Sequence, residues 1–159
     1  MDTSFQKTAA SDEWYTPIEL IRSLGQFDLD PCAPMEPLWR TATRMVNKEE
    51  DGLKVEWAGR VWCNPPYSQP LLTQFCEKMA AHDNGILLLF SRTGNKVFQE
   101  TLFPACHSIF FMRHRVRFYS PDGSRGGSPG CDSVLIAFGE ENTRAIQQSG
   151  QEGYLFVNR

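Results

Sequence analysis

The segment Val61-Trp62-Cys63-Asn64-Pro65-Pro66-Tyr67-Ser68 contains the strongest indication of the fold of this chain. The apolar residues at its start predict the end of a buried strand over residues 60–63. Each proline fixes its own φ and disfavours the α conformation in the residue before it. Asn64 and Pro65 are therefore predicted to be extended and rigid at the carboxyl end of a strand, where open α/β sheets bind ligands.

The residues after this strand offer the groups that a reaction at an amino nitrogen needs. An exocyclic nitrogen such as adenine N6 is a poor nucleophile because its lone pair is delocalised into the ring. The side-chain oxygen of Asn64 and the carbonyl of Pro65 can each accept one of its N–H groups, which favours tetrahedral geometry and aims the lone pair. Pro66 completes this predicted catalytic loop, and Tyr67 offers a ring for an unstacked base, a contact of about 1–3 kcal/mol. The alternative is a Pro-Pro turn capped by an asparagine.

Strands and helices alternate along the chain, which predicts a single α/β layered domain. Residues 1–11 are expected to be a flexible N-terminus and residues 12–159 to form the domain. Thr16-Pro17-Ile18-Glu19 is typical of a helix start, with Thr16 as N-cap, Pro17 in the first turn and Glu19 closing a capping box. Helices are expected at about 17–24, 69–81 and 96–102, and strands at about 27–30, 43–46, 60–63, 85–90, 108–112, 116–119 and 133–138.

Composition limits the classes of function. The net charge of −3 supplies no overall positive field, so any affinity for nucleic acid must come from a local patch. The five cysteines are widely spaced and the three histidines have no ligand spacing, which favours a reduced cytoplasmic protein without a metal site. No signal peptide or membrane span is predicted, so no membrane partner is expected.

A second group of interest lies at residues 27–33, where a short strand ends in an acidic turn. Asp30 can accept a hydrogen bond from a ligand ammonium or hydroxyl, and the small Ala33 allows close approach of the backbone. A surface Asp-Pro turn is an equally common meaning of this pattern. The absence of a G-x-G-x-x-G fingerprint argues against a nicotinamide or flavin enzyme.

Taken in order, residues 12–17, 28–33, 49–53, Trp57 and 61–68 closely resemble the small phage-type (Dam-like) DNA N6-adenine methyltransferases. The resemblance covers about residues 12–138. It implies S-adenosylmethionine (SAM) as methyl donor, DNA adenine as substrate and a Rossmann-like methyltransferase sheet. That sheet would be mostly parallel, with a C-terminal antiparallel hairpin. A phage or prophage protein acting in a bacterial host cell is also implied.

The resemblance implies roles for individual positions. Asn64, Pro65, Pro66 and Tyr67 would form the catalytic loop. The implied cofactor-binding positions are Trp14, Tyr15, Thr16 and Pro17 at the methionine end, the loop Asp30, Pro31, Cys32 and Ala33, Asp51 at the adenine amino group, and Asn64.

The chain also departs from the pattern of larger methyltransferases. Their glycine-rich loop is replaced by Cys32-Ala33-Pro34. The acid that holds the cofactor ribose is not identified, and Asn47, Glu49 and Glu50 are the candidates. A solvated turn is the alternative meaning of the acidic trio at 49–51.

The best candidate for a DNA-binding surface is the segment 113–125, which has four arginines and one aspartate, a net charge of +3. Alternate residues of a strand share a face, so Arg113, Arg115 and Arg117 would line up towards phosphates, with Arg125 following. An edge strand kept soluble by its charges is the alternative. Arg92, directly after the 85–90 strand, is also expected to face the substrate.

The sequence thus predicts a SAM-dependent DNA adenine-N6 methyltransferase that flips its target base out of the duplex. Two alternatives stay open. One is the same chemistry on RNA or on a protein amide nitrogen, and the other is a non-catalytic DNA-binding module with this fold. The sequence gives no indication of the oligomeric state.

Overall fold

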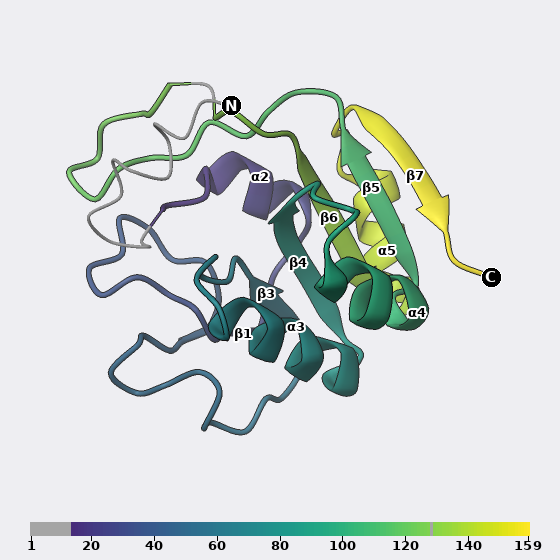
Figure 1. Cartoon of the computed structure of the whole chain (residues 1–159). Coiled ribbons are helices and arrows are strands. Elements are labelled where there is room, and N and C mark those ends of the chain that lie inside the picture. The colour runs from purple at the N-terminus through teal and green to yellow at the C-terminus, as the bar shows by residue number, and fades with distance from the viewer. Residues whose placement is uncertain (1–13, 128) are drawn as a thin grey trace.

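The structure is a computed structural model that describes residues 14–127 and 129–159, and it contains one seven-stranded sheet with helices on both faces (Figure 1). The strand order is β2-β1-β3-β4-β6-β5-β7. The strands are β1 (Leu29–Asp30), β2 (Arg44–Met45), β3 (Val61–Cys63), β4 (Gly85–Phe90), β5 (Ser108–Met112), β6 (Ser133–Phe138) and β7 (Gly153–Val157). The helices are α2 (Ile18–Ser23), α3 (Leu71–His82), the π-helical turn η1 (Phe98–Leu102), α4 (Phe103–Ala105) and α5 (Glu140–Gln148).

The sheet has a parallel and an antiparallel half. β2, β1, β3 and β4 are parallel neighbours, whereas β6 runs antiparallel to both β4 and β5. β7 pairs antiparallel with β5 and forms the outer edge. The predicted Rossmann-like α/β sheet is confirmed, with parallel N-terminal and antiparallel C-terminal strands. Three of its six strand pairings are antiparallel, so the antiparallel part is larger than the predicted hairpin, and β7 is an additional strand that the sequence analysis did not predict.

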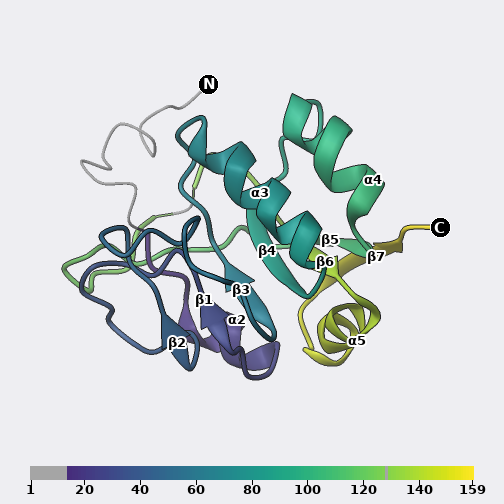
Figure 2. The ribbon, with the colours of Figure 1, turned by 90° about the horizontal axis from the view of Figure 1, so that it is seen from below.

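Helices cover both faces of the sheet (Figure 2), and each face has its own apolar core. On one face α3, η1 and α4 pack over Leu87 and Leu89 of β4, and on the other α2 and α5 pack over Ile86 and Leu88. All six residues of β4 are buried, as predicted for an uninterrupted apolar run covered on both sides. The predicted apolar face of α3 is also confirmed, because Leu72, Phe75, Cys76 and Met79 are its buried residues.

Two local predictions are wrong. α2 begins at Ile18 with Pro17 as its N-cap residue, and no side chain caps it. Thr16 does not cap because its hydroxyl is bonded by the Asn64 side chain instead. Residues 116–119 form no strand; Tyr119 makes only isolated bridges, to Tyr15 and Arg125. The loop after Tyr119 turns back on itself, with the Gly126 amide donating to the Phe118 carbonyl, so no longer ladder develops.

The sequence analysis did not predict α5 or β7. Helix α5 contains few apolar residues, so the hydrophobic pattern is weak, and a buried polar network anchors it instead. Asn142 Nδ2 donates to the Phe138 carbonyl at 2.7 Å and to Asn84 Oδ1 at 3.0 Å. Arg60 Nε donates to Asn142 Oδ1 at 2.6 Å, and its guanidinium lies 4.1 Å from the Phe27 ring centroid.

The fold brings the carboxyl ends of β1 and β3 together. Leu29 of β1 lies beside Val61 of β3 in parallel register, so the loops that follow the two strands leave the sheet side by side. The turn at Gly52 packs against the first of these loops so closely that a Cβ there would lie 1.9 Å from the Pro31 carbonyl oxygen. This approach fixes the 49–53 turn against the loop after β1.

We expect Gly52→Ala to lower the free energy of unfolding by about 2–3 kcal/mol, because the new methyl group has no room beside the Pro31 carbonyl. Gly94→Ala is the matched control, since nothing lies within 4 Å of the position that its new methyl group would occupy. It should change stability by no more than about 0.5 kcal/mol. Urea denaturation of both variants measures the difference. Equal changes in the two variants would contradict the tight approach at Gly52.

Candidate active site

A small cavity lies where the loops after β1 and β3 meet the segment that precedes α2. Its volume is about 20 Å³, enough for a single water molecule. The residues that line it are Trp14, Tyr15, Thr16, Asp30, Cys32, Pro34, Trp39, Thr41, Trp62 and Asn64. The loop after β1 contacts the end of β3, where Cys32 Sγ and Cys63 Sγ are 3.6 Å apart. Burial raises the pKa of both thiols, which keeps them protonated.

Asn64 is oriented by the segment before α2. Its Nδ2 donates to Thr16 Oγ1 at 3.2 Å and to the Trp14 carbonyl at 3.4 Å. A carbonyl can only accept, so this contact fixes which end of the amide carries the nitrogen. The Oδ1 atom receives no donor from the described part of the chain and is the acceptor that Asn64 offers to a ligand. Pro65, which follows, is buried at the strand tip.

Tyr67 is held against β4. Its hydroxyl accepts the Phe90 amide N–H at 2.9 Å, and its ring stacks on the Phe90 ring with centroids 4.7 Å apart and planes at 16°. Burial raises the pKa of Tyr67 well above its usual range, and the charge of Arg92 offsets a small part of this rise. The ring is therefore neutral and fixed. One of its faces is covered by Phe90, so a base that stacks on Tyr67 must use the other.

Asp30 is a buried carboxylate without a cationic partner among the described residues. It accepts hydrogen bonds from the Thr41 hydroxyl and, at 3.0 Å, from the Cys32 amide. Burial raises its pKa from 3.8 to about 6, although both hydrogen bonds oppose this rise. A cation placed against Asp30 would restore the ionised form, so the site is suited to the ammonium group of a ligand.

Aromatic rings form the outer wall of the cavity. Trp39 Nε1 donates to the Thr16 carbonyl at 3.0 Å, and its ring meets Tyr119 edge-on at 5.0 Å. Tyr15 donates its hydroxyl proton to the Glu36 carbonyl at 2.6 Å. The segment 34–41 therefore closes over the site by contacts with the segment before α2.

Four of the lining residues were not among the sequence-based candidates: Pro34, Trp39, Thr41 and Trp62. The first three lie in an irregular segment whose two prolines gave no indication of its path. The proximity of Trp39 and Thr41 to the Asp30 turn was the one available signal, an aromatic and a hydroxyl residue within 11 positions of the acid.

The remaining cofactor candidates lie around the cavity without lining it. Pro17 caps α2, Pro31 packs against the 49–53 turn, and the Ala33 amide donates to the Val46 carbonyl at 3.0 Å. Asp51 lies in that turn, where its Oδ1 accepts the Leu53 amide at 3.0 Å.

The three candidates for a ribose-binding residue also lie outside the cavity wall. The amides of Glu49 and Glu50 donate to Asn47 Oδ1 at 3.0 and 3.2 Å, and both glutamates are exposed. This arrangement fits the solvated turn that was the alternative interpretation of the acidic trio.

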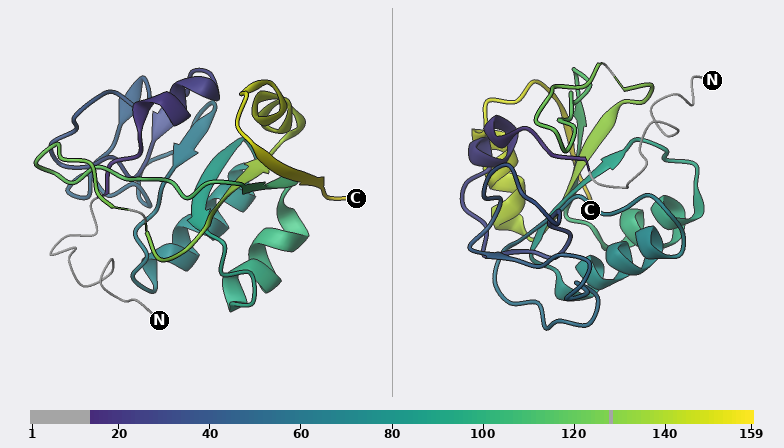
Figure 3. Two further views of the ribbon diagram at one scale, coloured as in Figure 1. Left: turned by 90° about the horizontal axis from the view of Figure 1, so that it is seen from above. Right: turned by 90° about the vertical axis from the view of Figure 1, so that its left-hand side faces the viewer.

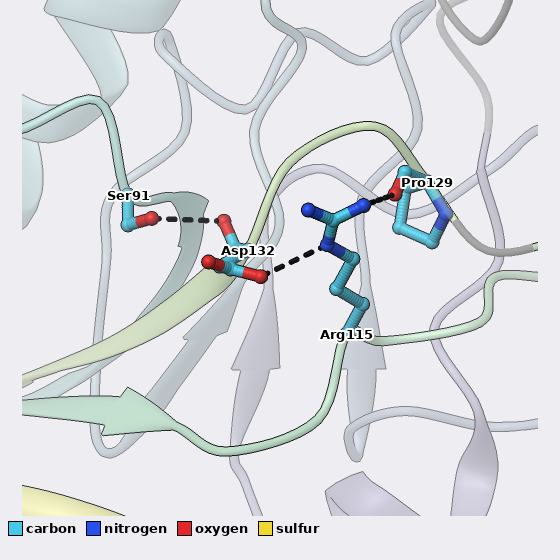
Figure 4. A network of polar contacts seen from close by, with 4 residues as sticks. All are labelled: Ser91, Arg115, Pro129 and Asp132. Carbon is cyan, nitrogen blue, oxygen red and sulfur yellow. Dashed lines mark hydrogen bonds and ion pairs between the residues drawn. The ribbon is translucent and has the colours of Figure 1, made fainter.

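The segments that carry the candidate DNA-binding arginines leave the sheet at the same end of the strands as the cavity, which is the carboxyl end of β1, β3, β4 and β5. β4 and β5 both run antiparallel to β6, so the loops after β4 and β5 leave on the side where β6 begins. Arg115 is tied down there: Nε contacts Asp132 Oδ1 at 2.9 Å and an Nη atom donates to the Pro129 carbonyl at 2.9 Å (Figure 4). The hydroxyl of Ser91 donates to the Asp132 carbonyl at 3.2 Å, which joins the loop after β4 to this network (Figure 4).

The arginines differ in how far their charges are neutralised. Arg113 lies 3.4 Å from Glu152, and Arg115 pairs with Asp132. Arg92, Arg117 and Arg125 form no ion pair with any carboxylate in residues 14–127 or 129–159. Arg117 donates to the Gly126 carbonyl at 3.3 Å, and the Arg125 guanidinium lies 5.1 Å from the Tyr119 ring centroid.

The segment 113–125, called the arginine loop below, is joined by backbone contacts to Tyr15, which lines the cavity. The Tyr15 amide donates to the Tyr119 carbonyl at 3.0 Å, and the Tyr119 amide donates back at 2.9 Å. Arg115 and Arg117 are exposed and alternate with buried Val116 and Phe118, so the predicted alternation is present although the strand is not.

The described part of the chain has neither a candidate metal site nor a membrane-spanning helix. No group of three or more histidine, cysteine or acidic side chains in the described residues is placed to hold a metal ion. None of the helices described in the structure is long and apolar enough to cross a membrane.

Comparison with known proteins agrees with the geometry. The sequence model of the family described as DNA N-6-adenine-methyltransferase (Dam) matches residues 3–151. A DNA N-6-adenine-methyltransferase of Escherichia phage T1 is 34% identical over 88 residues, which are 51% of this chain and 36% of that protein. The match thus spans little more than a third of this relative's length. No solved structure matches the chain significantly. The family match covers nearly the whole chain, and the chain therefore belongs to the Dam family of DNA N-6-adenine-methyltransferases.

Proposed function

We propose that this protein transfers a methyl group from SAM to adenine N6 in DNA. The observation that supports this most is the arrangement at the carboxyl ends of β1 and β3. There the open acceptor Oδ1 of Asn64 and the buried carboxylate of Asp30, which has no cationic partner among the described residues, line the same cavity. Asn64 suits an amino nucleophile and Asp30 suits a cationic ligand. The proposed sites for the methyl acceptor and the methyl donor are therefore adjacent.

The residues of the cavity fit SAM chemically. The cofactor has an ammonium group, which Asp30 can pair with, and a sulfonium, which the rings of Trp14, Trp39 and Trp62 can favour by cation–π attraction. When bound, it supplies the electrophilic methyl group. Pockets for such ligands have about 300–1,000 Å³, so the cavity must widen from its present size. The movable walls are the loop segments that carry Trp14 and Trp39, because the strand tips are fixed by the sheet.

The other cofactor positions of the family resemblance are proposed to surround this ligand. Tyr15 and Thr16 line the cavity with Cys32, and Pro17 follows them. Pro31 and Ala33 shape the loop after β1. Asp51 is proposed to bind the adenine end because its turn packs against Pro31.

The chain's own residues would activate the target nitrogen by position and hydrogen bonding. Asn64 Oδ1 and the Pro65 carbonyl accept the two N6 hydrogens of a flipped adenine, which localises the lone pair for attack on the methyl group. Pro66 keeps this loop extended. Tyr67, which Phe90 holds in place, is the ring proposed to contact the base.

DNA would approach over the arginine loop. Arg92, Arg117 and Arg125 retain their charge for phosphates, whereas Arg113 and Arg115 are partly neutralised by carboxylates. Arg115 also holds the segment 129–132, so we assign it a positioning role as well as a phosphate contact.

The direct test uses three separate reactions. Each contains the protein and tritiated-methyl SAM, together with unmethylated DNA, RNA or a protein extract as the substrate. We expect label in DNA alone, recovered as N6-methyladenine by nucleoside mass spectrometry. Asn64→Ala should lower this transfer at least about 100-fold, because the acceptor for N6 is lost. Asn64→Asp keeps an acceptor oxygen and should retain more activity than Asn64→Ala.

Label in RNA or protein instead of DNA would reject DNA as the substrate and support methyl transfer to RNA or to a protein amide nitrogen. Full transfer by a folded Asn64→Ala protein would reject the assigned role of Asn64.

The raised pKa of Asp30 predicts two opposite pH trends. SAM needs the ionised carboxylate, so its affinity should rise about tenfold between about pH 5 and pH 8, with the midpoint near the pKa of about 6. Without ligand, the folded protein binds a proton between pH 4 and 6 that the unfolded chain does not. Its stability should therefore fall by up to about 3 kcal/mol as pH rises through this range.

Asp30→Asn is the control for both trends. Calorimetric titration with SAM should show weak, pH-independent binding, and denaturation curves should lose this part of the pH dependence. Identical pH profiles for the wild type and Asp30→Asn would show that Asp30 neither titrates near pH 6 nor contacts the cofactor.

The unneutralised arginines should dominate the salt dependence of DNA binding. We expect Arg117→Ala and Arg125→Ala each to reduce the slope of log K against log salt by about 1. Arg144→Ala serves as control, because Arg144 lies on α5 and pairs with Glu140 at 3.2 Å. Fluorescence anisotropy with a labelled duplex measures the slopes. An equal change for Arg144→Ala would remove the support for a localised DNA surface.

A further inference from the structure

β7 is an open edge of the sheet, the yellow strand in Figure 3, and its exposed side chains are apolar. Among the described residues, five large apolar side chains are exposed, and three of them belong to this one strand: Tyr154 at 77%, Phe156 at 61% and Val157 at 48%. No charged residue interrupts residues 153–157. Proteins usually protect a sheet edge with charges, prolines or a covering segment, and β7 has none of these among the described residues.

The backbone of β7 is ready to pair on its outer side. The Arg113 amide donates to the Glu152 carbonyl at 2.9 Å, and the Asn158 amide donates to the His107 carbonyl at 2.8 Å. Even-numbered residues of β7 therefore direct their N–H and C=O groups towards β5. In an antiparallel ladder the alternate residues point away, so Gly153, Leu155 and Val157 present theirs to the open edge.

We propose that two copies of this chain form a dimer by antiparallel pairing of their β7 strands, with the two-fold axis at Leu155. In this register the outward groups of Leu155 face those of Leu155 in the second copy, and Gly153 pairs with Val157. Tyr154 then lies opposite Phe156 of the second copy on the same face of the sheet. Such cross-strand aromatic pairs stabilise sheets, and this pair would cover the two most exposed apolar side chains of the described residues.

The charges at the ends of β7 favour this orientation. Glu152 precedes the strand and Arg159 follows it. Antiparallel pairing brings Glu152 of one copy near Arg159 of the other, while Glu152 also keeps its contacts with Arg113 and His114 of its own copy. A parallel arrangement would place like charges side by side, which is unfavourable.

The area beside β7 can extend the interface beyond a bare strand edge. An apolar groove of about 450 Å³ runs between α4 and the β5–β7 face, lined by Phe103, Cys106, Ile109, Phe111, Phe156, Val157 and Asn158. Phe156 forms one side of it and meets Phe111 with ring centroids 5.8 Å apart. Tyr154 of the second copy would lie next to Phe156 and cover this groove, adding apolar contact towards the 1,200–2,000 Å² or so that a specific interface buries.

The proposed dimer leaves the candidate active site accessible. β7 lies at one edge of the sheet, and β2 and β1 lie at the other (Figure 2). The cavity beside β1 and β3 would therefore face outward in each copy. The inference does not depend on methyl transfer and can be tested on the protein without substrate.

Sedimentation equilibrium of the wild type, at concentrations up to about 100 μM, should give about twice the 18.1 kDa mass of one chain. Tyr154→Lys and Phe156→Glu should each reduce the mass to that of one chain, because each replaces both Tyr154–Phe156 pairs and buries two charged groups in the interface without a partner of opposite charge. Leu71→Lys changes an exposed apolar residue on α3 and should leave the dimer intact.

Mixing the two charged variants tests the register. Lys at position 154 of one copy then faces Glu at position 156 of the other, and the native Tyr154–Phe156 pair remains on the second side. The mixture should recover the dimer mass, although each variant alone does not. Circular dichroism checks that both variants are folded. A single-chain mass for the wild type, or no recovery on mixing, would overturn the proposal.

Discussion

The hydrogen bonds from Asn64 to the segment before α2 set the arrangement of the whole candidate site. They hold the amide with its oxygen outward, and they occupy the Thr16 hydroxyl that the sequence pattern would assign to a helix cap. Helix α2 begins without a side-chain cap as a result, which costs it roughly 1 kcal/mol. The chain thus gives up a local stabilising contact in order to fix a polar group at the strand tip. Such conflicts between local and global preference are typical of functional sites.

The burial of Asp30 is a second feature of the site that lowers the stability of the fold. Its burial raises its pKa to about 6, so near neutral pH the unliganded protein holds a carboxylate that water would solvate better. Thr41 and the Cys32 amide offset only part of that cost. The remainder is available to a cationic ligand, because its positive charge removes the penalty. A carboxylate whose charge is incompletely compensated is therefore suited to bind such a ligand.

The success of sequence reasoning here follows the strength of local signals. The run at 85–90 and the spacing of Leu72, Phe75 and Met79 depend on burial alone, and both elements were predicted. Helix α5 could not be predicted because Asn142 anchors it through Arg60 and Asn84, which are distant in sequence. In the site, Asn64 and Asp30 follow strands and were identifiable. Trp39 and Thr41 were not, because only the tertiary path of an irregular segment brings them to the cavity.

The walls of the cavity divide into a rigid and an adjustable part. Asp30 is the last residue of β1 and Asn64 directly follows β3, and both strands have a neighbour on each side, whereas Tyr15 and Trp39 lie in segments joined to each other by contacts such as Trp39 with the Thr16 carbonyl. A ligand larger than the present cavity must exchange those contacts for its own. Tyr15 is also paired through its backbone with Tyr119, beside Arg125. The proposed cofactor pocket is therefore joined to the proposed DNA surface by these two backbone hydrogen bonds and by the edge-on contact of Trp39 with Tyr119.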